Sequence, residues 1–95
     1  MVRPAAAADI LEAHEWYEKQ SAGLGEQLLV ALTDTLARIV EHPEAFPVLH
    51  RSTRRALVPH RFPYGIFYRL VDDAIVVVAI MHASRDPSAW RRRLP

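Results

Sequence analysis

Two apolar runs separated by only two residues constrain the fold of this chain more than any other feature of its sequence. Tyr64–Val71 and Ala74–Met81 are rich in aromatic and β-branched residues, which favour strands. Asp72 and Asp73 leave room only for a tight turn, so the runs predict an antiparallel hairpin. Because Ala74–Met81 is apolar at both alternating positions, we expect a central strand that is covered on both faces.

The first half of the chain has the periodicity of helices. Apolar residues recur every three or four positions from Ala5 to about Gln20 and again from about Leu24 to Glu41. Gly23 and Pro43 supply the stop signals, and the short loop between the segments predicts a helical hairpin. The expected core positions are Ala6, Ile10, Ala13 and Tyr17, with Leu11 beside them, and then Gly25, Leu29, Leu32, Leu36 and Ile39 or Val40.

The remaining segments complete a predicted α+β fold. Residues 42–53 are expected to form a loop that Phe46, Val48 and Leu49 attach to the core, followed by a short strand over Arg54–Val58. Aspartate at 86 and proline at 87 predict the start of a last helix of one or two turns. We therefore expect an N-terminal helical hairpin packed on a small antiparallel sheet of three to four strands, with a short C-terminal helix.

Positive charge is concentrated in the second half of the chain. Residues 1–45 contain three basic and eight acidic side chains, a net charge of −5, whereas residues 46–95 contain nine basic and three acidic ones, a net charge of +6. Eleven of the twelve basic residues are arginine, which suits bidentate contacts to phosphate or carboxylate, although a GC-rich genome also favours arginine. The asymmetry between the halves indicates charged partners.

Several classes of protein are excluded or disfavoured by composition. The chain has no cysteine, so it has no disulfide and no thiolate metal site. Its five histidines lack metal-binding spacing, and no glycine-rich phosphate loop is present, so we expect no metal and no cofactor. No apolar run approaches the about 20 residues that span a bilayer, and the start lacks a secretory pattern. We expect a cytoplasmic protein without membrane contacts, with a single domain over residues 1–95.

Six segments follow one another in a recognisable order. They are AAAADILEAHEWYE, the GLG turn at residues 23–25, IVEHPEAFP, RRALVPHRFPYGIFYRL, IVVVAIMH and SRDPSAWRRR. The series resembles the RelE/ParE superfamily of toxins from bacterial type II toxin–antitoxin systems, over nearly the whole chain. The resemblance implies a RelE/ParE-like fold and, as the main partner, a cognate antitoxin that neutralises the toxin and forms a hetero-oligomeric complex with it.

The beginning of the chain departs from the superfamily pattern. Members usually start with an edge strand of several residues, whereas only Met1–Pro4 precede the alanines here, and Pro4 cannot donate a ladder hydrogen bond. We expect this strand to be abbreviated or absent, unless the start codon was assigned late. An absent strand would expose a sheet edge to which an antitoxin strand could add.

One branch of the superfamily, resembling RelE, cleaves messenger RNA at the ribosome without a metal. Such chemistry needs an acid, a base and cations around the phosphorane. The candidate catalytic residues are Arg61, Arg69, His82 and Arg85, and Arg54, Arg55 and Tyr68 are further possibilities. However, Gly65 stands where this branch often has a basic residue, and Trp90 lies where some members have a tyrosine. Both departures weaken the ribonuclease hypothesis.

Each candidate also has a purely structural explanation. His82 could cap the end of a strand, Arg85 could pair with Asp86 or with the acidic helices, and Trp90 could pack the last helix on the sheet. Tyr64 and Tyr68 alternate within a strand, a pattern that is typical of core residues.

The other branch, resembling ParE, binds DNA gyrase and blocks it without catalysis. The ending RDPxxW of Arg85–Trp90 is similar to that of ParE-like members. We therefore favour a non-enzymatic gyrase inhibitor, with the ribosome-dependent endoribonuclease as the alternative. The candidate target-binding residues are Arg54, Arg55, His82, Arg85, Trp90 and Arg91. A protein that binds DNA on its own is disfavoured because the acidic half would repel phosphates.

Overall fold

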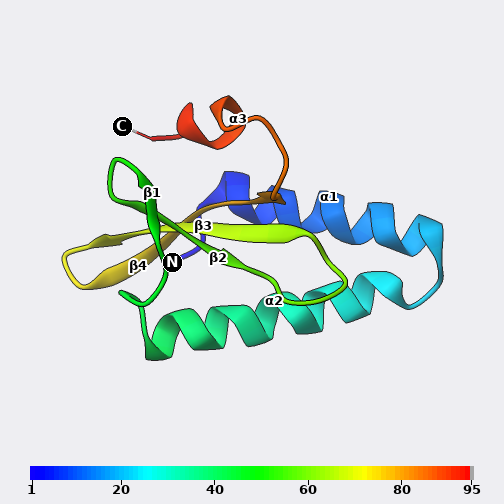
Figure 1. Ribbon diagram of the computed structural model, residues 1–95. Helices are drawn as coiled ribbons and strands as arrows, with labels where there is room; N and C mark the ends of the chain where they lie inside the picture. Colours follow the sequence, from blue (N-terminus) through cyan, green and yellow to red (C-terminus); the bar gives the residue numbers. More distant parts are fainter. Residues whose placement is uncertain (95) are drawn as a thin grey trace.

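The computed structural model describes residues 1–94, in which a four-stranded antiparallel sheet separates a pair of long helices from one short helix (Figure 1). In chain order the elements are α1 (Pro4–Gln20), α2 (Leu24–Glu41), β1 (Val48–His50), β2 (Thr53–Leu57), β3 (Tyr64–Val71), β4 (Ala74–His82) and α3 (Ser88–Arg91). This arrangement confirms the predicted α+β fold, the helical hairpin, the small sheet and the short last helix.

The two long helices pack closely because glycine stands where they approach each other. A Cβ atom at Gly25 would lie 2.7 Å from the side chain of His14 and 2.8 Å from its backbone oxygen. Gly23 has a φ of +87° and precedes the first turn of α2, where it accommodates the sharp change of direction. The backbone N–H of Gly25 donates a hydrogen bond of 2.8 Å to the carboxylate of Glu18, which further fixes the junction.

The close contact at Gly25 sets the rotation of α2, and it corrects part of the predicted core. The buried positions are Gly25, Leu28, Leu32, Thr35 and Ile39. Leu29 and Leu36, which were predicted in the core, are only partly buried, and the buried residues are their preceding neighbours Leu28 and Thr35. Of the alternatives Ile39 and Val40, Ile39 is the core residue, whereas Val40 is 68% exposed. The prediction of Leu11 beside the core was wrong, since Leu11 is 65% exposed.

The sheet has the order β1-β2-β3-β4, with every neighbouring pair antiparallel. The predicted hairpin is confirmed: Asp72 and Asp73 have φ values of 49° and 67°, as a tight two-residue turn between strands requires. The expected loop over residues 42–53 is wrong in one respect, because it contains strand β1. Arg51 and Ser52 form a second turn with positive φ, without the glycine or asparagine that would have indicated it.

The N-terminal residues pair with the outer edge of β4. The Met1 amine donates to the Ile75 carbonyl at 2.7 Å, and the Val77 N–H donates to the Met1 carbonyl at 2.8 Å. The Arg3 N–H then donates to the Val77 carbonyl at 3.0 Å, in a parallel bridge. The first strand is thus abbreviated, and this part of β4 is not an open edge. The strand order also corrects the expectation that β4 is central, although both of its faces are covered.

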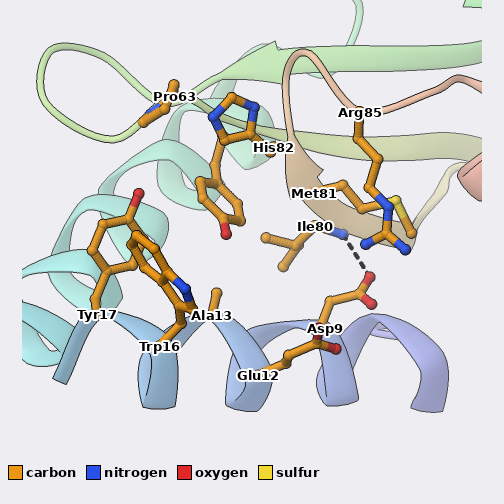
Figure 2. Close-up of a pocket in the computed structure, with 11 residues that line it drawn as sticks. Asp9, Glu12, Ala13, Trp16, Tyr17, Pro63, Ile80, Met81, His82 and Arg85 are labelled. Atoms are coloured by element: carbon orange, nitrogen blue, oxygen red, sulfur yellow. Dashed lines mark hydrogen bonds between the residues drawn. The ribbon is translucent and has the colours of Figure 1, made fainter. Parts of the chain in front are cut away.

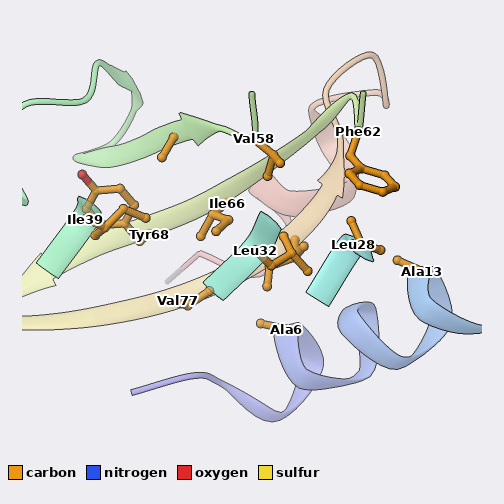
Figure 3. Close-up of a cluster of buried hydrophobic side chains, with 12 residues drawn as sticks. Ala6, Ala13, Leu28, Leu32, Ile39, Val58, Phe62, Ile66, Tyr68 and Val77 are labelled. Carbon is orange, nitrogen blue, oxygen red and sulfur yellow. The ribbon is translucent and has the colours of Figure 1, made fainter. Parts of the chain in front are cut away.

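The core is divided between the two faces of the sheet. The larger cluster lies under α1 and α2 and includes Leu28, Leu32, Ile66 and Tyr68 (Figure 3). The Tyr68 hydroxyl donates to the Pro43 carbonyl at 2.6 Å, so this tyrosine is a core residue that also holds the end of the helical hairpin.

The smaller cluster attaches α3 to the other face of the sheet. The Trp90 ring stacks on Phe67, with centroids 4.8 Å apart, and only 3% of Trp90 is exposed. Ala79, Met81 and Ala89 complete this cluster. Among residues 1–94, no helix has the combination of length and apolarity that crossing a bilayer requires.

Candidate functional site

A cavity of about 470 Å³ opens between α1 and the ends of β3 and β4 (Figure 2). Its walls are formed by Asp9, Glu12, Ala13, Trp16 and Tyr17 of α1, by Pro63 and Tyr64, and by Ile80, Met81, His82 and Arg85. Two of the predicted site residues, His82 and Arg85, therefore share one site. Sequence reasoning missed the contribution of α1, although Trp16, a large aromatic residue off the apolar stripe of the helix, was an available signal.

Aromatic rings form one wall of the cavity. Tyr17 and Tyr64 have ring centroids 6.0 Å apart, and Trp16 lies edge-on to Tyr17 at 4.9 Å. Burial raises the pKa values of Tyr17 and Tyr64 above their usual value, so both hydroxyls are neutral hydrogen-bonding groups at physiological pH. Trp16 is 56% exposed, which is unusual for so large an apolar side chain and is typical of residues that contact a partner.

His82 is held in one tautomer at the mouth of the cavity. Its Nδ1 atom accepts a hydrogen bond of 3.1 Å from the Ser84 N–H and lies 2.7 Å from the Ser84 hydroxyl. Since a backbone N–H can only donate, Nδ1 is the acceptor and the proton of the neutral ring is on Nε2. The His82 carbonyl accepts from the Arg85 N–H at 3.0 Å, and this turn directs the Arg85 side chain toward Asp9 (Figure 2).

Asp9, at the base of the cavity, has a structural role. One of its oxygens accepts a hydrogen bond of 2.9 Å from the Ile80 N–H, and both oxygens accept hydrogen bonds from Arg93. These hydrogen bonds use both oxygens of the carboxylate to hold α1 against β4 and the end of the chain. The other polar side chains of the cavity that can donate hydrogen bonds to a bound partner include His82, Arg85 and the two tyrosine hydroxyls.

The other two proposed ribonuclease residues do not lie in this cavity. Arg61 donates to the side-chain oxygen of Gln27 on α2 at 2.5 Å. Arg69 pairs with Val76 of β4, six residues before His82, which corresponds to about 20 Å along the strand. The structure thus brings together His82 and Arg85 but not the complete set of four.

The remaining arginine candidates lie on β2 and α3. Arg54 donates to the carbonyls of Glu44 and Phe46, at 3.0 and 2.7 Å, and so anchors the loop after α2. The side chain of Arg55 passes over Gly65, and a Cβ atom at Gly65 would be 3.0 Å from the Cγ and Cδ atoms of Arg55. Arg91 is exposed, with its guanidinium carbon 5.5 Å from the ring of the buried Trp90. Trp90 therefore positions Arg91 and offers little of its own surface.

A second hollow, of about 450 Å³, lies beside α3 and has a basic lining. It is formed by His50, Arg51, Asp86, Pro87, Ser88, Arg91 and Arg92. The Asp86 carboxylate accepts a hydrogen bond of 2.9 Å from the Ser88 N–H, and α3 begins at Ser88 with Pro87 as its N-cap, one residue later than predicted. This hydrogen bond lowers the pKa of Asp86. Residues 1–94 contain no group of three or more histidine, aspartate or glutamate side chains that could hold a metal ion.

A helical hairpin on one face of a four-stranded antiparallel sheet, with a short helix on the other, is the α+β architecture of the RelE/ParE-like fold. The family model described as the ParE toxin of the type II toxin-antitoxin system, parDE, matches residues 1–87, and the chain belongs to this family. Toxin ParE2, from two strains of Mycobacterium tuberculosis, is 29% identical over 82 residues, which cover 85% of this chain and 77% of the relative. The chain is therefore the toxin of a type II toxin–antitoxin system.

Proposed function

We propose that this toxin acts by binding DNA gyrase in the cytoplasm, without chemistry of its own, and that a cognate antitoxin neutralises it. The observation that supports this proposal most strongly is the separation of the cationic residues. A ribonuclease of this fold needs several cations around one phosphate, whereas Arg61 contacts α2 and Arg69 lies about 20 Å along the sheet from His82. We further propose that residues 1–95 act as one toxin domain.

The surface around the cavity is suited to contact with a protein. The exposed ring of Trp16 borders a hollow that already contains His82 and Arg85, and it offers a large rigid apolar surface next to charged groups. Residues of this kind dominate the binding energy of protein interfaces. We assign the target contact to this cavity, with Arg85 as the charged residue and Trp16 as the aromatic anchor.

The alternative function is ribosome-dependent cleavage of messenger RNA. It is favoured by one observation: His82, with an N–H at Nε2, and the cation Arg85 line the same cavity. In that case Arg85 would stabilise the charge of the phosphorane and the Nε2–H of His82 would donate a hydrogen bond to a phosphate oxygen.

The antitoxin would bind where the sheet still has an open edge. Met1–Arg3 pair along β4 at Ile75 and Val77, and Asp9 accepts the Ile80 N–H, so strand addition there is blocked. The other edge is β1, whose Val48 and Leu49 side chains are 52% and 38% exposed. We propose that an antitoxin strand pairs with β1.

The test is a supercoiling assay with bacterial DNA gyrase and purified, antitoxin-free toxin. We expect inhibition or trapped cleaved DNA at stoichiometric toxin, and loss of this effect in Arg85→Ala. The matched control is Lys19→Ala, which removes an exposed cation at the far end of α1. A folded toxin without effect on gyrase contradicts the proposal, and codon-position cleavage of a translated message would then establish the alternative.

A further inference from the structure

Two arginines lie side by side on the face of the sheet that α3 covers only in part. Arg55 pairs with Phe67, which in turn pairs with Ala79, and Trp90 stacks on Phe67. Residues opposite each other in a sheet share a face, so Arg55 belongs to the α3 side. Arg69 is two residues beyond Phe67 on β3 and therefore lies on the same face, as a diagonal neighbour of Arg55 at about 7 Å between Cα atoms.

A buried threonine lies in the same row as Arg69. The β2–β3 register, continued by one residue from the pair of Arg54 and Tyr68, places Thr53 opposite Arg69. On its other side Thr53 pairs with His50 of β1, whose ring lies 6.3 Å from Trp90. The row therefore runs from the basic hollow beside α3 to the centre of the sheet.

Polar atoms of all three residues lack hydrogen-bond partners. Within residues 1–94, the Thr53 hydroxyl, the Arg55 Nε and the Arg69 Nε are buried and have no acceptor or donor. Thr53 is 0% exposed, and neither arginine forms an ion pair with a described residue. Buried polar groups of folded proteins are almost always satisfied, so three unsatisfied groups on adjacent strands indicate a site completed by something else.

Glycine at position 65 leaves the space that Arg55 occupies. Since a Cβ there would approach the Cγ and Cδ of Arg55 to 3.0 Å, the arginine stem lies flat against the sheet at this point. Two half-buried guanidinium groups with the same charge repel each other unless an anion lies between them.

We propose that Arg55 and Arg69, together with Thr53 beside Arg69, form a binding site for a carboxylate of an extended acidic segment in a partner protein. One carboxylate can accept hydrogen bonds from two arginines. A second acidic side chain of the same segment would reach the adjacent hollow, where Arg51 and Arg91 are exposed. That the partner is the antitoxin rests on the function proposed above, whereas the site itself does not.

The surroundings favour an acidic protein segment over a nucleic acid. Single-stranded RNA and DNA are bound through aromatic rings on which bases stack. The aromatic residues of this face, Phe67 and Trp90, are 2% and 3% exposed, so their rings are not accessible to bases. The apolar side chains that border the site, Leu57 and Val71, are 51% and 40% exposed and fit the apolar residues of a peptide.

The test uses nuclear magnetic resonance of the arginine Nε–Hε groups in the whole toxin, with hexaglutamate as the probe. We expect saturable shifts of the Arg55 and Arg69 signals, and an affinity that falls about tenfold in Arg55→Gln and in Arg69→Gln. The matched control is Arg38→Gln, an exposed arginine of α2 on the other side of the sheet, which should bind within about twofold of wild type. Binding should weaken between about 50 mM and 300 mM salt.

A second variant and a second probe make the outcome unambiguous. Gly65→Ala keeps both charges but displaces the Arg55 stem, so it should also weaken hexaglutamate binding. If hexaglutamate does not shift the two signals, or binds all variants equally, there is no such site. If hexauridylate binds more tightly than hexaglutamate and depends on the same arginines, the ligand is a nucleic acid and the proposal is wrong. Gyrase inhibition by the wild-type toxin is measured separately, so failure of the proposed function is distinguished from failure of this site.

Discussion

Arg93 donates two hydrogen bonds to the carboxylate of Asp9, at 2.7 Å from Nη1 to Oδ2 and 3.0 Å from Nη2 to Oδ1, although the residues are 84 positions apart. The pair lies at an irregularity of the sheet, because Phe67 pairs with Ala79 while the next residue of β3 pairs with Val77. The residue between them, Val78, has a carbonyl that accepts from Arg93 at 3.2 Å. The ion pair thus supplies hydrogen-bond partners for the Val78 carbonyl and the Ile80 N–H, which lie beyond the part of β4 that pairs with Met1–Arg3.

Removal of one partner of this pair should destabilise the fold. The side chains of Asp9 and Arg93 are 10% and 26% exposed, so the cost should lie between that of a surface pair and that of a fully buried pair. We expect Arg93→Ala to lower the free energy of unfolding by about 2 kcal/mol, measured by urea denaturation. The neighbouring exposed Arg92→Ala should change it by less than about 0.5 kcal/mol. Equal effects of the two substitutions would contradict the role of the pair.

Glu18 should make the helical hairpin sensitive to acid. Hydrogen bonds from the backbone N–H groups of Gly23 and Gly25 lower the pKa of its carboxyl group. A pKa that is lower in the folded state means that the stabilisation is present above the unfolded value and is lost as pH falls through the folded value. We expect the free energy of unfolding to decrease between about pH 5 and pH 3, with a shallower decrease in Glu18→Gln.

The control for this pH dependence is Glu15→Gln, on the exposed face of the same helix, which should keep the wild-type slope. The measurement is a series of urea denaturation curves at fixed ionic strength. An unchanged slope in Glu18→Gln would show that the hydrogen bonds to the loop do not depend on the charge of Glu18.

The two glycines at the helix junction should respond differently to substitution. Alanine at Gly25 places Cβ 2.8 Å from the backbone oxygen of His14, which can move only with α1, so Gly25→Ala should cost about 1–3 kcal/mol. A Cβ at Gly23 meets no atom within 4 Å, and its φ of +87° is a conformation that asparagine tolerates. Gly23→Asn should therefore cost less than about 1 kcal/mol, as measured by thermal unfolding. A larger loss in Gly23→Asn would invalidate this account of the junction.

Trp16 should matter for toxicity more than for stability. Its ring is 56% exposed beside His82 and Arg85, so Trp16→Ala removes little buried surface. We expect at least about a tenfold increase in the toxin concentration that inhibits gyrase, because exposed aromatic residues are frequent hot spots of protein interfaces. Leu11→Ala is the matched control, since Leu11 is 65% exposed on the same helix but does not line the cavity. Equal inhibition by both variants would remove Trp16 from the target contact.

Local chemistry explains which parts of the fold could be predicted from the sequence. The helix ends at Gln20 and Glu41, shortly before Gly23 and Pro43, and the turn at Asp72 and Asp73 were predicted correctly, because they depend on backbone preferences of single residues. Gly23 itself is the N-cap of α2 and not the C′ residue of α1. Strand β1 was missed because its turn, at Arg51 and Ser52, uses residues without a preference for positive φ. Its pairing with β2 is stabilised by the neighbouring strand and not by its own sequence.

The candidate site also has one part that the sequence predicted and one part that it did not. The sequence predicted that His82 and Arg85 lie close together. Arg85 follows the end of the strand at His82 by only three residues, so it cannot lie far from it. The sequence could not place Trp16 beside them, or separate Arg69 from them, since both relationships depend on how α1 and the strands are arranged in space.

The sequence by itself determined the elements, their order and the polarised distribution of charge, because periodicity, turn residues and net charge are local properties of the chain. The tertiary structure decided which arginines are engaged and which are not: Arg93 is paired with Asp9 and Arg54 with loop carbonyls, whereas Arg55 and Arg69 share a face without an anion among the described residues. Such pairings join residues far apart in sequence, so they follow only from the register of the sheet and the packing of the helices on it.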